Sequence, residues 1–227
     1  MVNDRSVAPL ELTAWCDLQC QYSERVIRWL DGLGPSVVRP TYRAFGLEQV
    51  NRDASATAWR LWEQPLDYDH HGGKPWKRSL AAFLATAVLD AAGEPEVAKR
   101  FRHATLDARW LEKRDLSDPA VLVELAGVAG ADAGALAEAL AGSTPDGLRR
   151  QADARATIAA DWAAARADFA IFGVPTLRWG LIAPVYLRLR HVPEPDEARP
   201  LLDALVDLRE RFPLVLELEE PGRLDAG

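Results

Sequence analysis

Apolar and polar residues alternate near the start of the chain and then recur at helical spacing. Alternate positions from 9 to 15 are apolar, as in a half-buried strand, and this stretch ends at Cys16. Between 21 and 33 the apolar residues fall on one helical face, and a Gly-Pro pair follows. Residues 36–45 are rich in β-branched and aromatic side chains, and Pro40 predicts an edge strand or a bulge there. These patterns predict a strand–helix–strand unit.

The middle of the chain, from 47 to 167, has helical periodicity and almost no strand candidates. Gly and Pro breaks delimit helices at about 53–63, 77–92, 96–110, 119–129 and 131–141. A longer helix is expected from Thr144 to about Asp168, with Ser143 or Thr144 as its N-cap. We therefore expect an all-helical block here.

Strand patterns return after this block. A loop enters a strand over 172–179, a second alternating strand is expected at 183–190, and a helix at 196–212. The acidic tail from 214 is expected to form a short strand and a frayed end. The pattern predicts an α/β fold in which 1–46 and 168–227 form one domain and 47–167 form a helical insertion.

Composition and charge narrow the function. The 227 residues include 27 basic and 34 acidic side chains, for a net charge of -7, which argues against a nucleic-acid partner. No apolar run is long enough to span a membrane, and residues 1–6 lack a signal-peptide pattern. We therefore expect no membrane partner and a cytoplasmic location, where cysteines stay as thiols.

The two cysteines are the main candidates for chemistry. Cys20 lies at the expected helix start, where free N–H groups and the helix dipole favour the thiolate and predict a lowered pKa. Ser23 follows three residues later. Cys16 ends the strand, where we expect either a buried, inert residue or a resolving partner of Cys20.

Three segments resemble one known family. WCDLQCQYSERVIRWL is similar to the first active-site segment of DsbA-like thioredoxin-fold proteins, particularly the FrnE branch. DLSDPAVLVELAGVAG resembles the helical insertion of that branch, and FGVPTL resembles the thioredoxin cis-proline loop. In this resemblance Asp17 matches the acidic residue before the motif, Cys20 the nucleophile and Ser23 the position of the resolving cysteine. The resemblance implies a thioredoxin-like fold with a large helical insertion.

The resemblance also implies a mechanism and a substrate-binding surface. Ser23 cannot resolve a mixed disulfide, so a monothiol route follows, in which Cys20 attacks and Ser23 donates a hydrogen bond to its sulfur. A second thiol from solution, or Cys16, would release the adduct. Val174, Pro175 and Thr176 would form the loop that pairs with an extended substrate.

The residues between Cys20 and Ser23 complete the predicted site. Gln21 and Tyr22 are expected at its rim, in contact with a thiol or disulfide substrate. No tightly bound cofactor is expected, apart from a low-molecular-weight thiol such as glutathione as a co-substrate. The oligomeric state stays open.

Two other functions remain open. The resemblance extends to glutathione transferases of the kappa class and 2-hydroxychromene-2-carboxylate isomerases, in which a Ser such as Ser23 would activate glutathione. Otherwise Ser23 bonds local backbone in the first helical turn. A non-catalytic binding or chaperone module would keep the fold without turnover.

Other polar and aromatic clusters have simpler explanations. His70 and His71, with Asp67 and Asp69, lack Cys or Glu at ligand spacing and are interpreted as a solvated turn, so no metal is expected. Three tryptophans of the insertion either roof the thiol or pack in the core: Trp59, Trp62 and Trp76.

Overall fold

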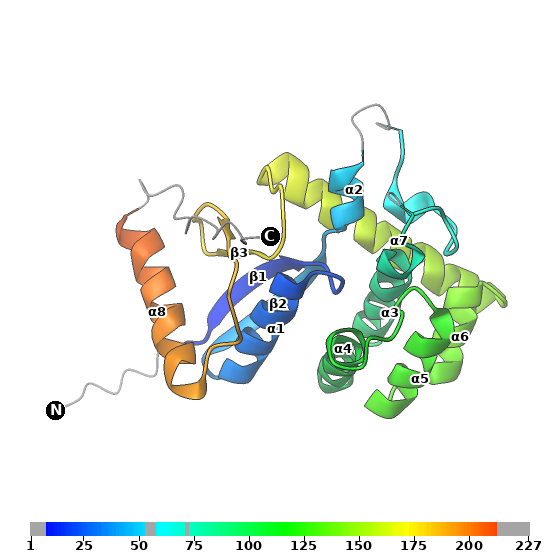
Figure 1. Cartoon of the computed structure of the whole chain (residues 1–227), viewed down its shortest axis with the longest axis horizontal. Helices are drawn as coiled ribbons and strands as arrows, with labels where there is room; N and C mark the ends of the chain where they lie inside the picture. The colour runs from blue at the N-terminus through cyan, green and yellow to red at the C-terminus, as the bar shows by residue number, and fades with distance from the viewer. Residues whose placement is uncertain (1–7, 53–57, 71–72, 213–227) are drawn as a thin grey trace, which may run out of the picture.

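A four-stranded mixed sheet forms the centre of the computed structural model, which describes residues 8–52, 58–70 and 73–212 (Figure 1). The strand order is β2-β1-β3-β4. β1 runs parallel to β2 and antiparallel to β3, and β3 is antiparallel to β4. The strands are β1 (Leu10–Cys16), β2 (Val38–Ala44), β3 (Thr176–Trp179) and β4 (Val185–Tyr186).

Helix α1 (Gln21–Leu33) connects β1 to β2, as the parallel pairing of these strands requires. Val26, Ile27 and Leu30 of the predicted face are buried, and Trp29 is buried beside them. Pro40 lies in β2, which is an edge strand of the sheet, as predicted. Helix α8 (Pro195–Arg211) packs on α1, where the indole of Trp29 donates to the Ala198 carbonyl over 2.9 Å.

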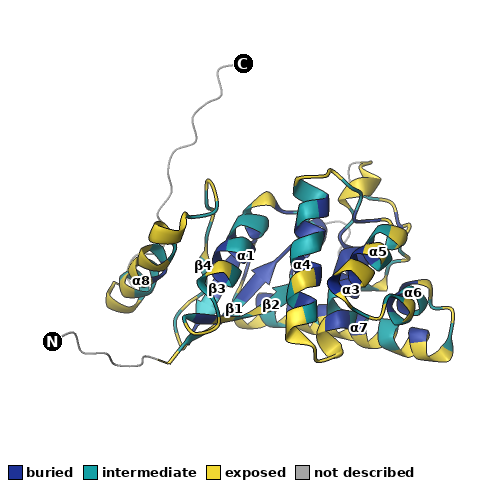
Figure 2. Ribbon diagram, turned by 90° about the horizontal axis from the view of Figure 1, so that it is seen from below, coloured by how far each residue is buried: buried dark blue, intermediate teal, exposed yellow. Residues whose placement is uncertain are grey.

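The segment between β2 and β3 is helical in the residues that the structure describes and lies to one side of the sheet (Figure 2). Its elements are α2 (Leu47–Asn51), the 3-10 turns η2 (Leu61–Glu63) and η3 (Pro75–Lys77), α3 (Leu80–Ala91), α4 (Pro95–Trp110), α5 (Pro119–Ala129), α6 (Ala133–Ala141), α7 (Pro145–Ala163) and the π-helical turn η4 (Ala164–Asp168). The α7 start is capped as predicted, because the Thr144 hydroxyl accepts from the Gly147 N–H.

Two predicted elements are wrong. Residues 183–190 contain only the two-residue strand β4, because β3 begins at Thr176 and the chain beyond Tyr186 has no strand beside it. The helix expected at 53–63 is absent from its described part, 58–63, apart from the turn η2. There the Gln49 amide bonds the Trp59 carbonyl and the Leu61 N–H, at 2.9 and 2.8 Å, and holds the backbone extended. The predicted tail from 214 lies outside the described residues.

Two apolar clusters are built around β1. Leu12, Ala14 and Cys16 belong to a large cluster that includes α1 and most of the helical insertion. Trp15, which points to the opposite face of the strand, belongs to a smaller cluster that also contains Cys20 and Val174. The two cysteines therefore pack in different clusters.

Candidate functional site

The Cys20 sulfur lies where α1 begins, beside the loop that enters β3. Cys20 is the N-cap of α1, and its side chain is 8% exposed. Its thiol donates to the Val174 carbonyl oxygen, 3.7 Å away, and the Val174–Pro175 peptide is cis. The register places these segments side by side, because Trp15 of β1 pairs with Thr176 of β3.

Asp17 shapes the turn that leads from β1 to Cys20. The Cys20 N–H donates to the Asp17 carbonyl over 2.9 Å and closes this turn. The buried Asp17 carboxylate accepts from the N–H groups of Gln19 and Leu47, at 2.9 and 3.1 Å, and from the Ser79 hydroxyl at 3.0 Å. Burial raises the pKa of Asp17 from 3.8 to about 6, although these hydrogen bonds lower it.

The helical insertion holds the rest of this thiol loop, residues 17–20. The Gln19 amide donates to the carbonyls of Trp76 and Arg78, at 3.1 and 3.2 Å. The Trp110 indole donates to the Leu18 carbonyl over 3.3 Å. No local pattern in the sequence indicates these contacts, since they join residues far apart in the chain.

The pKa of Cys20 is raised, which corrects the lowered value expected from its place at a helix start. Burial of the thiol is the largest cause. The N–H groups of Ser23 and Tyr22 lower the pKa, as the helix start predicts, but Asp17 raises it further. The helix terminus therefore favours the thiolate less than burial opposes it.

Cys16 is a buried free thiol, as its strand position predicts. Burial raises its pKa far above the ordinary value, and the nearby Cys20 raises it further. Its thiol is therefore protonated at neutral pH.

Ser23 is completely buried in the first turn of α1. Its oxygen accepts the Asp17 N–H over 3.2 Å, the local backbone bond expected from its position. The Ser23 hydroxyl also lowers the pKa of both thiols, although burial raises each pKa by more.

The remaining predicted site residues differ in their access to solvent. Gln21 is exposed, and the half-buried Tyr22 ring lies 5.4 and 5.5 Å from the guanidinium carbons of Arg25 and Arg188. Thr176 is buried, and its hydroxyl donates to the Gly173 carbonyl over 2.8 Å. The Thr176 side chain thus stabilises the loop itself.

The π-helical end of α7 positions the chain that faces Cys20. The Ile171 N–H donates to the Ala165 carbonyl over 2.9 Å, and Arg166 donates to the Ile171 carbonyl over 2.7 Å. Ala165 and Ile171 are buried in the same cluster as Cys20. A π turn of this kind is frequent at functional sites but leaves no clear mark in the sequence.

The tryptophans of the insertion have different environments. Trp59 and Trp62 are partly buried against the large cluster, as the core interpretation predicts. Trp76 is 47% exposed and contacts the thiol loop through its backbone carbonyl. His70 lies 3.5 Å from the Glu48 carboxylate, whereas His71 falls outside the described residues. No group of three His, Cys, Asp or Glu residues suited to a metal occurs in the described part of the chain.

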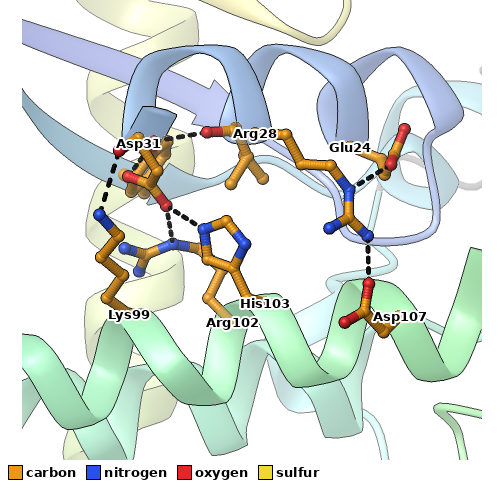
Figure 3. Close-up of polar contacts among 9 residues, drawn as sticks. Glu24, Arg28, Asp31, Lys99, Arg102, His103 and Asp107 are labelled. Carbon is orange, nitrogen blue, oxygen red and sulfur yellow. Dashed lines mark hydrogen bonds and ion pairs between the residues drawn. The ribbon is translucent and has the colours of Figure 1, made fainter. Parts of the chain in front are cut away.

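A polar seam holds α1 against α4 (Figure 3). The buried Asp31 carboxylate accepts from His103 at 2.9 Å and from the Tyr42 hydroxyl at 2.8 Å, and Arg102 lies 3.6 Å away. Arg28 extends the seam to Asp107 over 2.6 Å. The second half of the helix that begins at Cys20 is therefore fixed to the insertion.

The mixed sheet with a helical insertion, and a thiol at the start of its first helix, are the arrangement of a thioredoxin-like fold. No known family model and no curated protein matches the chain. Solved structures do match, and they show a DsbA-like thioredoxin fold with a helical insertion. Among the described residues no helix has the length and apolar character needed to cross a membrane.

Three of these structures cover nearly the whole chain. A putative protein disulfide isomerase from Nitrosomonas europaea is 16% identical, with a TM-score of 0.56 over 88% of this chain and 98% of that one. The cytosolic disulfide reductase DsbM from Pseudomonas aeruginosa is 21% identical, with a TM-score of 0.54 over 88% and 100%. A probable DsbA oxidoreductase from Streptomyces coelicolor is 17% identical, with a TM-score of 0.53 over 93% of each chain.

Proposed function

We propose that this chain is a thiol–disulfide oxidoreductase that works through one nucleophilic cysteine, Cys20. The position of its sulfur carries the proposal: it lies at the start of α1, 3.7 Å from the Val174 carbonyl oxygen and next to a cis X-Pro peptide. Ser23 stands where a second cysteine would be needed for a dithiol route. The resemblance to the FrnE branch supports the same assignment.

The proposed reaction consists of three thiol–disulfide exchanges. The Cys20 thiolate attacks a substrate disulfide, forms a mixed disulfide and releases one substrate thiolate, which takes up a proton. A small thiolate, such as that of glutathione, attacks the Cys20 sulfur and releases the second substrate thiolate. A second small thiolate then attacks the adduct and regenerates Cys20. One substrate disulfide is reduced, and two small thiols become one disulfide.

The surroundings of Cys20 favour reduction over oxidation. A strongly oxidising site stabilises its thiolate, whereas burial here raises the pKa of Cys20. The similar structure of a cytosolic disulfide reductase supports this direction. The route consumes reduced small thiol, so the proposal places the protein in the reducing cytoplasm.

The loop before β3 is the proposed substrate platform. In the resting state the Val174 carbonyl accepts the Cys20 thiol proton. Loss of that proton frees this carbonyl to pair with the backbone of an extended substrate. Gln21 and Tyr22 form the rim on the other side of the sulfur.

Ser23 disfavours the glutathione isomerase or transferase alternative. An activating hydroxyl would have to face an incoming thiol, but Ser23 is completely buried and its oxygen accepts the Asp17 N–H. The effect of Ser23 on the pKa of Cys20, which it lowers, instead suits a hydroxyl that stabilises the Cys20 thiolate.

Insulin reduction with and without glutathione tests the proposal. We expect wild-type turnover to require glutathione, and Cys20→Ser to abolish it. Ser23→Cys supplies a resolving thiol and should allow the reduced protein one round of insulin reduction without glutathione, whereas Ser143→Cys, which adds a thiol away from the site, should not. Full activity of Cys20→Ser would refute the proposal.

The mass of the protein after incubation with oxidised glutathione separates the two possible resolving routes. We expect one glutathione adduct, located on Cys20. A loss of two hydrogens without an adduct would show a Cys16–Cys20 disulfide and overturn the monothiol route.

A further inference from the structure

A cavity of about 230 Å³ lies between the sheet and the helical insertion, on the side of the thiol loop where Leu18, rather than Cys20, reaches its wall. Cys16 and Ile27 line it from the side of the sheet and α1, and Phe83 and Ile158 line it from α3 and α7. Neither Cys20 nor the Val174–Pro175 loop contributes to its walls. The elements around it can be followed in Figure 2.

The size and lining of this cavity distinguish it from ordinary packing defects. Protein interiors leave few voids larger than a water molecule. An apolar cavity of roughly 150 Å³ stays dry and accepts benzene, so this space is large enough for a substituted benzene ring. Its apolar side chains offer water few hydrogen bonds, and an apolar molecule would restore their missing contacts.

Two charged residues at the edge of the cavity neutralise each other. Arg43 donates to the Asp161 carboxylate over 2.6 Å, and the second oxygen of Asp161 accepts the Ala44 N–H over 2.9 Å. Because this carboxylate is satisfied on both oxygens, the pair does not demand an ionic ligand.

A second polar group lies at the α4 wall. Arg102 is 9% exposed, and its guanidinium carbon lies 4.3 Å from the centre of the Tyr42 ring. Its Nε is buried without a hydrogen bond, with the Asp31 carboxylate at 3.6 Å. Asp90, exposed on α3, also lines the cavity and brings an opposite charge. Because the buried Nε is not accessible to a ligand, only the terminal guanidinium nitrogens of Arg102 can donate into the cavity, whose Arg and Asp side chains have balanced charges.

We propose that this cavity binds a small, uncharged, mainly apolar molecule of about the size of a substituted benzene, with one hydrogen-bonding group. The apolar walls contact its body, and Arg102 donates to its polar group. A charged ligand is disfavoured because the Arg and Asp side chains of the walls already balance one another: Arg43 pairs with Asp161, and Asp90 offsets Arg102. Binding here does not depend on the chemistry proposed for Cys20.

Titrations followed by protein-observed NMR, with phenol and benzoate as probes, test this inference. Phenol should shift amides of α3 and α7 around the cavity and saturate, whereas benzoate should bind at least tenfold more weakly. Ala87→Leu fills the cavity and should weaken phenol binding at least tenfold. Ala152→Leu, an exposed change on α7, is the matched control and should bind phenol as wild type does.

A second filling variant keeps the test decisive if Ala87→Leu does not fold. Ala91 also lines the cavity but is exposed, so Ala91→Leu should fold and narrow the entrance. Three outcomes would overturn the inference: no saturation with phenol, unchanged phenol binding in the folded filling variants, or benzoate binding as tight as that of phenol.

Discussion

Replacement of Asp17 by Asn should remove a specific pH dependence from the stability of the protein. The folded chain holds a proton on Asp17 up to a pKa of about 6, whereas the unfolded chain loses it near 3.8. Between these values the folded state binds more protons, so the free energy of unfolding falls as pH rises. Across the difference between these two pKa values, the free energy of unfolding changes by about 3 kcal/mol, at about 1.36 kcal/mol for each pKa unit.

Urea unfolding of both chains between about pH 3.5 and pH 7.5 measures this effect. The unfolding free energy of Asp17→Asn minus that of wild type should grow by about 3 kcal/mol from the acid to the neutral end. Altered hydrogen bonds to Leu47 and Ser79 shift this difference by an amount that does not vary with pH. A difference that stays flat across the range would refute the raised pKa of Asp17.

Three further substitutions test other parts of the fold. Gly147→Ala would drive a Cβ into the Glu138 carbonyl oxygen and should destabilise the chain by about 1–3 kcal/mol, measured by urea unfolding. Gly32→Ala, with no atom within 4 Å of its Cβ, should instead stabilise α1 by about 0.5–1 kcal/mol. If the two substitutions changed the unfolding free energy equally, the close packing of Gly147 in α7 on Glu138 in α6 would be contradicted. Asp31→Asn should lower the unfolding free energy by about 3 kcal/mol at neutral pH. Burial opposes ionisation of Asp31, but hydrogen bonds and the charge of Arg102 lower its pKa overall. The carboxylate therefore stabilises the folded state above pH 3.8, and this contribution is lost as the pH falls below that value. Loss of stability that does not shrink in acid would count against this seam.

Local pattern predicted most of the elements, because periodicity and breaker residues act over a few positions. The bounds of α1 and of the helix at 119–129 agree with the structure, and so does the Thr144 cap. The prediction of a long strand at 183–190 was wrong. The length of a strand depends on how far its neighbour extends, and the alternation of residues within 183–190 carries no information about that neighbour. The helix predicted at 53–63 is absent from the described residues 58–63, because the Gln49 side chain of α2 bonds the backbone of Trp59 and Leu61.

The sequence predicted where Cys20 and Ser23 lie in the fold, but it did not predict the electrostatics around them. The motif placed Cys20 at the helix start, next to Ser23, and the structure agrees. The expected fall in the pKa of Cys20 was wrong, since burial depends on residues from η4 and the β3 loop that cover the sulfur. Ser79 and Trp110, which hold the thiol loop, lie 62 and 92 positions from their partners and could not be found from local spacing.

The hydrogen bonds from the insertion to the thiol loop affect how this protein can be divided. Asp17, Leu18 and Gln19 all receive or make bonds with residues beyond β2. A shortened chain that lacked the insertion would keep Cys20 and its helix but lose the contacts that bend the backbone before them. The shape of the thiol loop therefore depends on both the sheet with α1 and the helical insertion. The sheet with α1 alone is not a minimal unit of this thiol site.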